Sequence, residues 1–444
     1  MHRISVLQLG DVHYDEFSSA KLNVDDKDSR APVHVVENIA RPVSLVVGEH
    51  IRERLRRGDR PLIAICGDFT SRGARAPFER AIAYFEGILN ADTKTAPTED
   101  ELHLVPGNHD VDWKSSMPYI DLSTDRLHPI ADVVTSSALT APLTLGSRHT
   151  TVHRGRARLS FSSVNSCRAT GAYRQAPELA VDDPVVEAIH AETGMEREQI
   201  RQAIQQWGVK TESARHEALD IPLIESSDLQ AIAGAIDSAE DHTLHVILAH
   251  HGFLPQVTAR INPYSEMVNG GDVRRMLLNF AKPILYLHGH VHEDHVEILS
   301  SGGPQHRGLR ESPVIVIAAP KLEHGYNEIV AEFGSLGKPL GITIKRYRIS
   351  GGIMHTERDE RISLCGRTVT DHRFKYILQR LHEFALATGD QILRWAHDDD
   401  APDATRRLAD DEIEECIETL CWQNVIDSSS ARSTPFENRE YSFR

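Results

Sequence analysis

The chain has 444 residues, which is enough for a large core and, by length alone, for two or three domains. Hydrophobic residues make up 40% and charged residues 26%, as in ordinary globular proteins, and the net charge of −16 argues against broad nonspecific nucleic-acid binding because such a surface repels polyanions. The five cysteines are scattered and form no CxxC pair, which argues against a disulfide framework and a cysteine zinc site and favours a reducing cytoplasm. The sequence has no apolar stretch of the roughly eighteen residues that a membrane helix needs, so we expect no membrane span.

Three short apolar runs near the N-terminus predict buried strands, and each run stops at a polar motif. Stretches with helical periodicity at 33–57 and 77–90 separate these runs. The first run meets Asp11 too early to be the core of a secretory signal, so we expect no leader. The runs and the motifs that follow them are 4–9 with Gly10-Asp11-Val12-His13, 62–66 with Gly67-Asp68, and 102–105 with Gly107-Asn108-His109-Asp110.

The same succession of strand, polar loop and helix continues along the chain. Two further apolar runs end on histidines, which are His250-His251 after 244–249 and Gly289-His290-Val291-His292 after 284–287. The recurrence predicts a mixed α/β sandwich, in which a ligand site lies beyond the carboxyl ends of the strands. The remaining elements predicted up to residue 350 are strands at 158–164, 313–319 and 341–349 and helices at 183–217, 226–238 and 272–280.

The character of the chain changes from about residue 351. The stretches 371–397 and 409–424 have helical patterns, and the polar stretch 425–444 is predicted to be a loose tail. We therefore expect a C-terminal helical segment that is distinct from the sandwich.

The residues of the five polar motifs are of the kinds that bind divalent metals. Carboxylate, imidazole and amide oxygen suit Mn²⁺, Fe²⁺ and Zn²⁺. Residues two apart in an extended segment point the same way, so Asp11 and His13 can face one ion together, and so can His290 and His292. Any one motif is a weak signal, but the ordered set at five strand ends is specific. A glycine that permits a sharp turn precedes three of the candidate ligands, at Gly67, Gly107 and Gly289.

In chain order the motifs are DVH, GDFTSRG, GNHD, AHHG and GHVH. With this set the sequence resembles the calcineurin-like metallophosphoesterase superfamily from residue 4 to about residue 350. The resemblance implies a four-layer α/β/β/α sandwich of two mixed sheets flanked by helices. It also implies a catalytic domain at 1–350 with an insertion at about 168–222, followed by the C-terminal helical segment at 351–444. The insertion is either a cap or partner platform beside the site, or surface decoration.

The resemblance also implies which residues bind two metal ions. Asp68, with two carboxylate oxygens, would bridge the ions. Mn²⁺ is our first choice for both ions, with Fe²⁺ or Zn²⁺ as alternatives. Of the neighbouring His250 and His251 we favour His250 as a ligand, because it directly follows the strand and Pro255 lies five residues on; His251 would then line the substrate pocket. The first ion would be bound by Asp11, His13, Asp68 and His292, and the second by Asp68, Asn108, His290 and His250.

The implied activity is phosphoester hydrolysis by a hydroxide that bridges the two ions. His109 would stand by the leaving group and stabilise its charge or donate a proton. Asp110 would either hold the His109 imidazole in its working tautomer or act only as a helix N-cap. Arg72 would either contact the substrate phosphate or have a structural role, and related sequences favour the structural role.

The substrate is less well specified by the sequence. We expect a phosphodiesterase that acts on a nucleotide-type substrate, and the alternatives are a DNA or RNA nuclease in a larger assembly or a phosphomonoesterase. The GNHD motif, rather than GNHE, points away from protein serine/threonine phosphatases. A nuclease would use the C-terminal helices to dock a protein partner, whereas a scaffold without activity would not need the complete ligand set.

Overall fold

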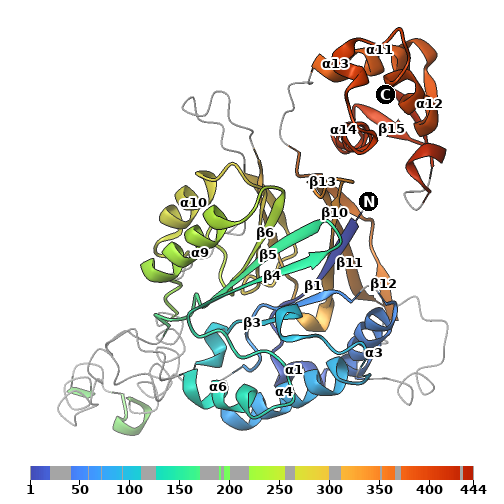
Figure 1. Ribbon diagram of the computed structural model, residues 1–444. Helices are drawn as coiled ribbons and strands as arrows, with labels where there is room; N and C mark the ends of the chain where they lie inside the picture. Colours follow the sequence, from blue (N-terminus) through green and yellow to red (C-terminus); the bar gives the residue numbers. More distant parts are fainter. Residues whose placement is uncertain are drawn as a thin grey trace.

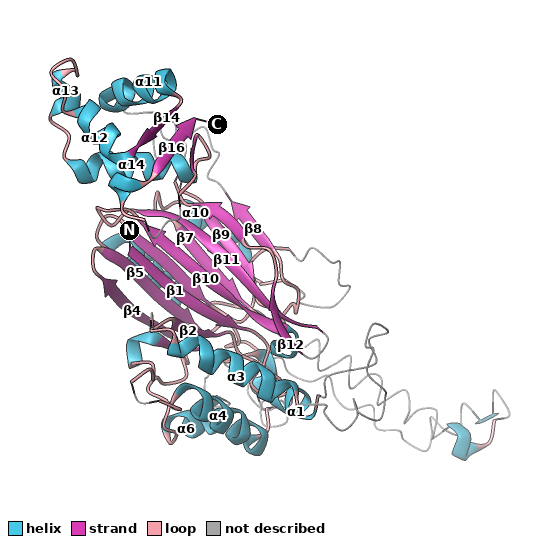
Figure 2. Cartoon of the chain, turned by 90° about the vertical axis from the view of Figure 1, so that its right-hand side faces the viewer, coloured by secondary structure: helices cyan, strands magenta, loops and turns pink. Residues whose placement is uncertain are grey.

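The structure is a computed structural model, and two large sheets stacked face to face dominate it (Figures 1 and 2). Together with the helices on their outer sides, these sheets confirm the predicted mixed α/β sandwich. The residues that the structure describes are 2–20, 42–58, 60–71, 73–92, 94–111, 127–170, 190–191, 195–200, 220–255, 266–299, 312–350, 353–365, 372–430 and 434–443.

The first sheet has the strand order β12-β11-β10-β1-β2-β3, with β13 also paired to β11. The strand β1 runs parallel to β2 and β2 parallel to β3, so the carboxyl ends of these three strands meet at one edge. β10 pairs with β1 in the antiparallel direction. The bounds are β1 His2–Leu9, β2 Leu62–Ile65, β3 Leu102–Leu104, β10 Gly325–Phe333, β11 Pro339–Ser350, β12 Ile353–Thr356 and β13 Glu360–Ser363.

The second sheet has the order β4-β5-β6-β7-β9-β8, and its middle strands β5, β6, β7 and β9 are parallel. The carboxyl ends of β6 and β7 therefore also lie together, and both histidine motifs follow them. The bounds are β4 Ser147–Arg154, β5 Ala157–Val164, β6 Thr243–Leu248, β7 Ile284–His288, β8 Val296–Leu299 and β9 Val314–Ala318.

Helices cover the outer face of each sheet. Figure 1 shows α1, α3, α4 and α6 against the first sheet and α9 and α10 against the second. The helices are α1 Tyr14–Ser19, α3 Val43–Arg56, α4 Arg75–Leu89, α6 His128–Thr135, α9 Ser226–Ser238 and α10 Gly270–Leu278, with 3-10 turns η1 Glu99–Glu101, η2 Asn108–Asp110 and η5 Leu322–His324. Among the described residues, no helix has the length and apolar character that crossing a membrane requires.

Successive side chains of β1 are buried on opposite faces of the sheet, which explains why the strand is apolar on both faces. Ile4 and Val6 are buried between the two sheets, whereas Leu7 and Leu9 are buried under the helices. A strand covered on both sides reads as a continuous apolar run, and this is the pattern from which it was predicted. Gln8 points into the layer between the sheets, where its Nε2 donates to the carbonyl oxygens of His288 (3.1 Å) and Ile317 (2.9 Å). This side chain ties β1 to the second sheet directly beneath the histidine motif that follows β7.

The C-terminal elements form a small cluster with an apolar core of their own at one end of the sandwich (Figures 1 and 2). α14 packs on the first sheet, where the Trp422 ring lies against Gly341 and beneath the Arg361 guanidinium, 4.4 Å from it. The bounds are η6 His372–Phe374, α11 Lys375–Phe384, β14 Leu386–Thr388, α12 Gly389–Ala396, α13 Asp403–Arg406, α14 Asp410–Trp422, β15 Ile426–Ser428, η7 Phe436–Asn438 and β16 Glu440–Phe443.

This cluster differs from the predicted helical segment in two ways. The strand β14 interrupts the helix expected over 371–397, and β16 pairs with both β14 and β15. The tail over 425–444 is therefore not a loose end throughout, because Tyr441 is fully buried and donates its hydroxyl to Glu418 at 3.1 Å. Backbone pairing with β14 and β15 supplies hydrogen bonds that a polar tail would otherwise make to water.

The first sheet also extends past the expected change of character at residue 351, because β12 and β13 pair with β11. The division of the chain into domains at residue 350 stays a prediction. Most of the expected insertion at 168–222 lies outside the described residues.

Candidate metal centre

The five polar motifs converge at the carboxyl ends of β1, β2, β3, β6 and β7. Direct contacts link these strand ends. The backbone N–H of His13 donates to the Asp68 carbonyl (2.7 Å), and that of His290 donates to both carboxylate oxygens of Asp11 (2.8 and 3.0 Å). His109 N–H donates to Asp68 Oδ1 at 2.9 Å. The two sheets therefore contribute to one site.

Several residues at the site have positive φ angles, a backbone conformation that residues other than glycine rarely adopt. Among the described residues, nine other than glycine have positive φ angles, and five of them are predicted ligands. Such positions cluster at functional sites, where the surrounding structure holds the strained backbone in place. The ligands concerned are Asp11 (φ 22°), His13 (φ 39°), Asp68 (φ 52°), His290 (φ 67°) and His292 (φ 57°).

Glycines make room for these turns, although in different ways. Gly67 has a φ of 95°, as expected for the sharp turn before Asp68. Gly107 has an ordinary negative φ, but a Cβ there would lie 2.0 Å from Asp68 Oδ1. At Gly289 a Cβ would lie 2.8 Å from Asp11 Oδ2. The last two positions thus need glycine for close approach and not for a positive φ.

A first group of ligand atoms brings together Asp11, His13, Asp68 and His292, all within 4.8 Å of one another. This is the set predicted for the first ion. His13 Nε2 is 3.5 Å from Asp68 Oδ2, and His292 Nε2 is 3.6 Å from Asp11 Oδ1. The His292 side chain is 42% exposed, whereas the other three side chains are buried. The group therefore opens to solvent on the side of His292.

A second group surrounds the same aspartate. His250 Nε2 lies 3.5 Å from Asp68 Oδ2 and 2.8 Å from Asn108 Oδ1. The single oxygen Oδ2 of Asp68 is thus equally far from the imidazoles of His13 and His250, as expected for a ligand between two ions. The ring of His290 lies beside that of His250, with centroids 5.2 Å apart.

The hydrogen bonds of His250 and His13 leave a lone pair directed into the site. His250 Nδ1 is 2.7 Å from the carbonyl oxygen of Cys66, so it must carry the proton. The unprotonated Nε2 then faces the side-chain amide of Asn108 at 2.8 Å, an arrangement that suits two ligands of one cation. His13 Nε2 is buried without any hydrogen-bond partner. Burial lowers the pKa of both imidazoles, which favours the neutral form that binds metal.

The spacing of the side chains fits divalent ions. Two ligands that each lie about 2.0–2.2 Å from one ion are about 2.8–3.6 Å apart in octahedral or tetrahedral geometry. The separations of 3.5–3.6 Å from His13, His250 and His292 to carboxylate oxygens are close to this spacing and too long for hydrogen bonds. The donor set and its geometry therefore suit two ions that share Asp68.

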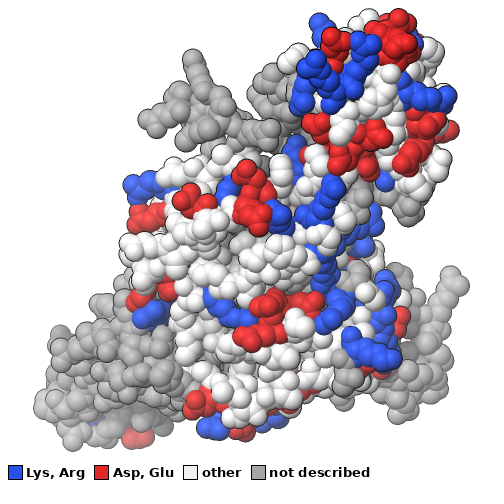
Figure 3. Space-filling view, viewed as in Figure 1, with Lys and Arg blue, Asp and Glu red and all other residues white. Residues whose placement is uncertain are grey.

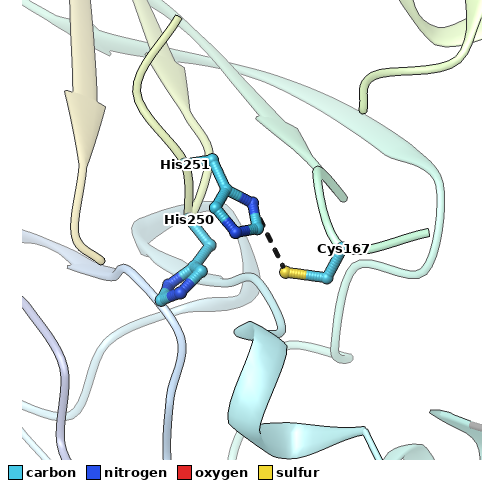
Figure 4. Close-up of side chains that lie close together, drawn as sticks. All are labelled: Cys167, His250 and His251. Carbon is cyan, nitrogen blue, oxygen red and sulfur yellow. Dashed lines mark hydrogen bonds between the residues drawn. The ribbon is translucent and has the colours of Figure 1, made fainter. Parts of the chain in front are cut away.

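His251 does not join the second group in the same way. Its Nδ1 is 3.0 Å from Ser166 Oγ, and its ring lies 4.5 Å from that of His290. Figure 4 shows His250 and His251 with Cys167, whose sulfur is 3.8 Å from His251 Nδ1. Cys167, His250 and His251 lie close enough together to form a ligand group, although burial raises the pKa of the Cys167 thiol well above its ordinary value and so favours the protonated thiol. His251 instead lines a pocket beside His290, together with Pro222, Leu254, Met267 and Val291.

The contacts of Asp110 and His109 bear on the two roles left open for Asp110. Asp110 accepts hydrogen bonds from the backbone N–H groups of Thr70 (3.0 Å) and Gly107 (2.9 Å), so it joins two loops. His109 Nδ1 instead lies 3.2 Å from the carbonyl oxygen of Ser71. Of the two roles left open for Asp110, these contacts favour the cap, because its carboxylate accepts the backbone N–H of Gly107 at the start of η2. The His109 ring lies 5.1 Å from that of His13, beside the first group. Arg72 lies outside the described residues.

Two acidic residues near the centre were not predicted. Asp220 lies 3.3 Å from His251 Nε2 and 3.7 Å from His290 Nε2. Asp294 fixes the loop that follows His292, because its carboxylate forms ion pairs with Arg346 (2.8 Å) and Arg348 of β11. Neither aspartate belongs to a recognisable motif. The position of Asp294, two residues after His292, is a weak sequence signal for a role at the centre. The sequence around Asp220 carries no such signal.

Comparison with the models of known families gives one match. The model of a family described as calcineurin-like phosphoesterase matches residues 4–294. A search of curated proteins finds no match.

Several solved structures are similar to the chain. A dimetal phosphatase from Danio rerio has 12% identity, with 81% of this chain and 99% of that chain covered and a TM-score of 0.44. A 5'-nucleotidase precursor from Thermus thermophilus has 12% identity, with 80% and 55% covered and a TM-score of 0.38. An NAD nucleotidase from Haemophilus influenzae has 11% identity, with 82% and 50% covered and a TM-score of 0.34.

Proposed function

The chain belongs to the calcineurin-like phosphoesterase family, and from this premise we propose that it is a two-metal phosphodiesterase that hydrolyses a small, nucleotide-type phosphodiester. The observation that carries the proposal is the position of Asp68, whose Oδ2 lies 3.5 Å from both His13 and His250. An oxygen placed between two imidazoles in this way suits the bridging ligand of a dinuclear centre.

The ligand assignment follows from the two groups. His250 is the ligand of the His250-His251 pair, because its unprotonated Nε2 faces Asp68 and Asn108. Two divalent ions, with Mn²⁺ as our choice, would supply positive charge at the phosphate oxygens and activate a water for attack. The first ion would be held by Asp11, His13, Asp68 and His292, and the second by Asp68, Asn108, His250 and His290.

His109 is suited to the leaving group. Its backbone N–H is fixed by Asp68 and its Nδ1 by the carbonyl of Ser71, so the ring is held at the edge of the first group. Burial alone would lower the pKa of His109, but the Asp68 carboxylate and the Ser71 carbonyl raise it above its ordinary value. A protonated imidazole in this place can donate a proton to the departing oxygen.

The charge of the described site supports a diester substrate. Lys321 lies near enough to His292 for its positive charge to oppose the rise in the pKa of that imidazole. Its ammonium group is ion-paired with Glu16 (2.7 Å) and Glu323 (3.1 Å). The ammonium group is thus already paired, so the positive charge beside a bound phosphate would come mainly from the two metal ions. A phosphodiester carries one negative charge fewer than a monoester and needs less compensation.

The surface supports a small substrate over a long polyanion. On the face shown in Figure 3, Lys and Arg lie among Asp and Glu. Ion pairs of the described residues, such as Arg156 with Asp411 and Arg346 with Glu360, likewise join opposite charges. A nuclease that tracks a phosphate backbone would gain from an unbroken basic groove.

All five cysteines are free thiols, which supports our proposal that the protein works in the reducing cytoplasm.

The test compares two aryl esters. Metal-stripped protein supplied again with Mn²⁺ should hydrolyse an aryl phosphodiester faster than the matching monoester. Asp68→Asn should lose the activity together with bound metal, whereas Asp228→Asn, a buried aspartate on α9, should keep both. Faster hydrolysis of the monoester would contradict the diester assignment, and an active Asp68→Asn variant with both ions bound would contradict the centre itself.

A further inference from the structure

Asp220 lies against the centre but belongs to none of its motifs. Its Oδ1 is 3.3 Å from His251 Nε2 and 3.3 Å from the hydroxyl of Thr170, and its Oδ2 is 3.7 Å from His290 Nε2. The residue is 8% exposed. One buried carboxylate therefore faces two imidazoles, and one of these belongs to a proposed ligand of the second ion.

The hydrogen bonds of His251 show which of its nitrogens carries the proton. Ser166 Oγ accepts the backbone N–H of His251 at 3.0 Å, so its own hydroxyl proton is available for His251 Nδ1, also at 3.0 Å. The ring proton then sits on Nε2, which lies 3.3 Å from Asp220 Oδ1. This nitrogen is buried and has no hydrogen-bond partner at standard geometry. The Asp220 carboxylate is the acceptor in reach of it.

A third metal ion between Asp220, His251 and His290 is the alternative that the same distances suggest, because these three residues can form a ligand group. Chemistry disfavours it. An imidazole offers one lone pair while its other nitrogen keeps a proton, so His290 cannot bind a second ion without losing both ring protons. Since His290 is assigned to the dinuclear centre, its Nε2 is better used as a hydrogen-bond donor.

We propose that Asp220 is a positioning residue of the metal centre: it lies close enough to accept the Nε2–H of His251, at 3.3 Å, and a small approach from 3.7 Å lets it accept the Nε2–H of His290 when the centre is loaded. The inference rests on the proposed function, because it takes His290 as a ligand of the second ion. With the proton of His290 held on Nε2 by Asp220, the lone pair of Nδ1 is left for that ion. Carboxylates that hold a metal-binding histidine in this way fix the tautomer and ring orientation and make the imidazole a stronger ligand.

The contact is expected to tighten when the centre is loaded. A bound cation draws electrons from the imidazole, so its N–H becomes a stronger donor to a carboxylate. The same carboxylate holds His251 at the wall of the neighbouring pocket, next to Pro222 and Met267. Asp220 thereby links the second ion to the surface on which a substrate group would lie.

The experiment measures metal binding and not turnover. Metal-stripped wild type, Asp220→Ala and Asp220→Asn are titrated with Mn²⁺, and the number of bound ions and their affinities are determined by equilibrium dialysis. Electron paramagnetic resonance distinguishes isolated Mn²⁺ from a coupled pair. Asp228→Asn is the matched control, since Asp228 is also buried and ion-paired, with Arg168, but stands on α9 away from the ligands.

We expect one ion to bind as in the wild type and the second to bind roughly 10–100-fold more weakly in Asp220→Ala, as is typical when a histidine ligand loses its carboxylate. Asp220→Asn keeps one acceptor oxygen and should lose less. The isolated-ion signal should replace that of the coupled pair at Mn²⁺ concentrations that fill both sites in the wild type and in Asp228→Asn.

Three results would overturn the inference. Two ions bound with wild-type affinity by Asp220→Ala would remove the role of Asp220. A third ion in the wild type that is absent from the variant would make Asp220 a ligand. Equal weakening of both ions, together with a lower melting temperature than Asp228→Asn, would make its role one of general stability. Wild-type protein that fails to bind two ions would refute the proposed function itself, and this first titration separates that failure from the other three.

Discussion

The backbone N–H of His290 donates to both carboxylate oxygens of Asp11, at 2.8 and 3.0 Å, and so joins loops that are 279 residues apart in the chain. Asp11 follows β1 in the first sheet, and His290 follows β7 in the second. The contact therefore sets the distance between the two halves of the candidate centre, and it places a proposed ligand of the first ion against a proposed ligand of the second.

Replacing Asp11 should disturb both ions. In Asp11→Asn the side chain keeps one oxygen but loses its charge, so the contact with His290 weakens and the first ion loses an anionic ligand. We expect at least about tenfold weaker Mn²⁺ binding and a comparable loss of rate. Metal content after dialysis and the hydrolysis rate test this. Full metal content with a full rate would show that Asp11 is not a ligand.

The two adjacent histidines should differ in metal binding. His250→Ala removes an unprotonated nitrogen that faces Asp68 and Asn108, so it should lower the occupancy of the second ion strongly. His251→Ala should lower it less, because His251 Nε2 faces the Asp220 carboxylate instead. Metal analysis of the two variants side by side decides the order, and the reverse order would exchange their roles.

His109 should matter for rate and not for metal content. His109→Ala leaves the ligand side chains in place, and the Asp68 contact to residue 109 is made by the backbone. We expect both ions to remain and the rate to fall by roughly 10²–10⁴, the usual contribution of a general acid. An ester with a very good leaving group should lose less rate, since it needs no proton. Loss of a metal ion from this variant would show His109 to be a ligand.

Much of the candidate centre could be predicted because its proposed ligands follow strands that are buried on both faces. Leu62 to Ile65 reads as a strand from composition alone, and Asp68 stands just beyond its end. By contrast, β10 was missed because it carries Glu328 and Glu332 in a fully buried strand. Their partners, Arg54 and Arg3, come from distant parts of the chain, so the sequence around β10 gives no sign that these charges are compensated.

Asp220 was missed for a related reason. Its function would depend on His251 and His290, which are 31 and 70 residues away, and no local pattern distinguishes it from a surface carboxylate. For Asp110 the sequence left two roles open, and its contacts with backbone N–H groups favour the cap. A carboxylate adjacent to His109 in sequence points to the backbone of residues 70 and 107, because the 3-10 turn of η2 directs the two side chains apart.

A buried histidine away from the centre should make stability depend on pH. His103 stacks on Phe161 with ring centroids 3.7 Å apart, and in its neutral form Nε2 donates to the Asp100 carbonyl while Nδ1 accepts from Ser163. Burial and the charge of Arg148 lower the pKa of His103 from 6.5 to about 3. The unfolded chain therefore binds a proton below pH 6.5 that the folded protein does not, and stability falls as the pH falls.

The size of this effect can be isolated with one variant. Between pH 7 and pH 5 the wild type should lose about 2 kcal/mol more of its free energy of unfolding than His103→Gln, which cannot titrate. Urea unfolding at both pH values provides the comparison. At pH 8 His103 is neutral in both states, so the difference between the two proteins should there be independent of pH. Equal slopes from pH 7 to pH 5 would show that His103 titrates normally in the folded protein.

Metal binding should stabilise the fold markedly, because the ligands hold a strained backbone. Positive φ angles at Asp11, His13 and Asp68 cost roughly 1–3 kcal/mol each, and the buried acceptors beside them repel one another without a cation. Mn²⁺ at a free concentration 100-fold above its Kd should raise the free energy of unfolding by about 2.7 kcal/mol for each ion. Thermal unfolding with and without Mn²⁺ measures the shift. Asp68→Asn should lose most of it and Asp228→Asn should keep it; an equal shift in both variants would mean that Mn²⁺ stabilises the protein from another site.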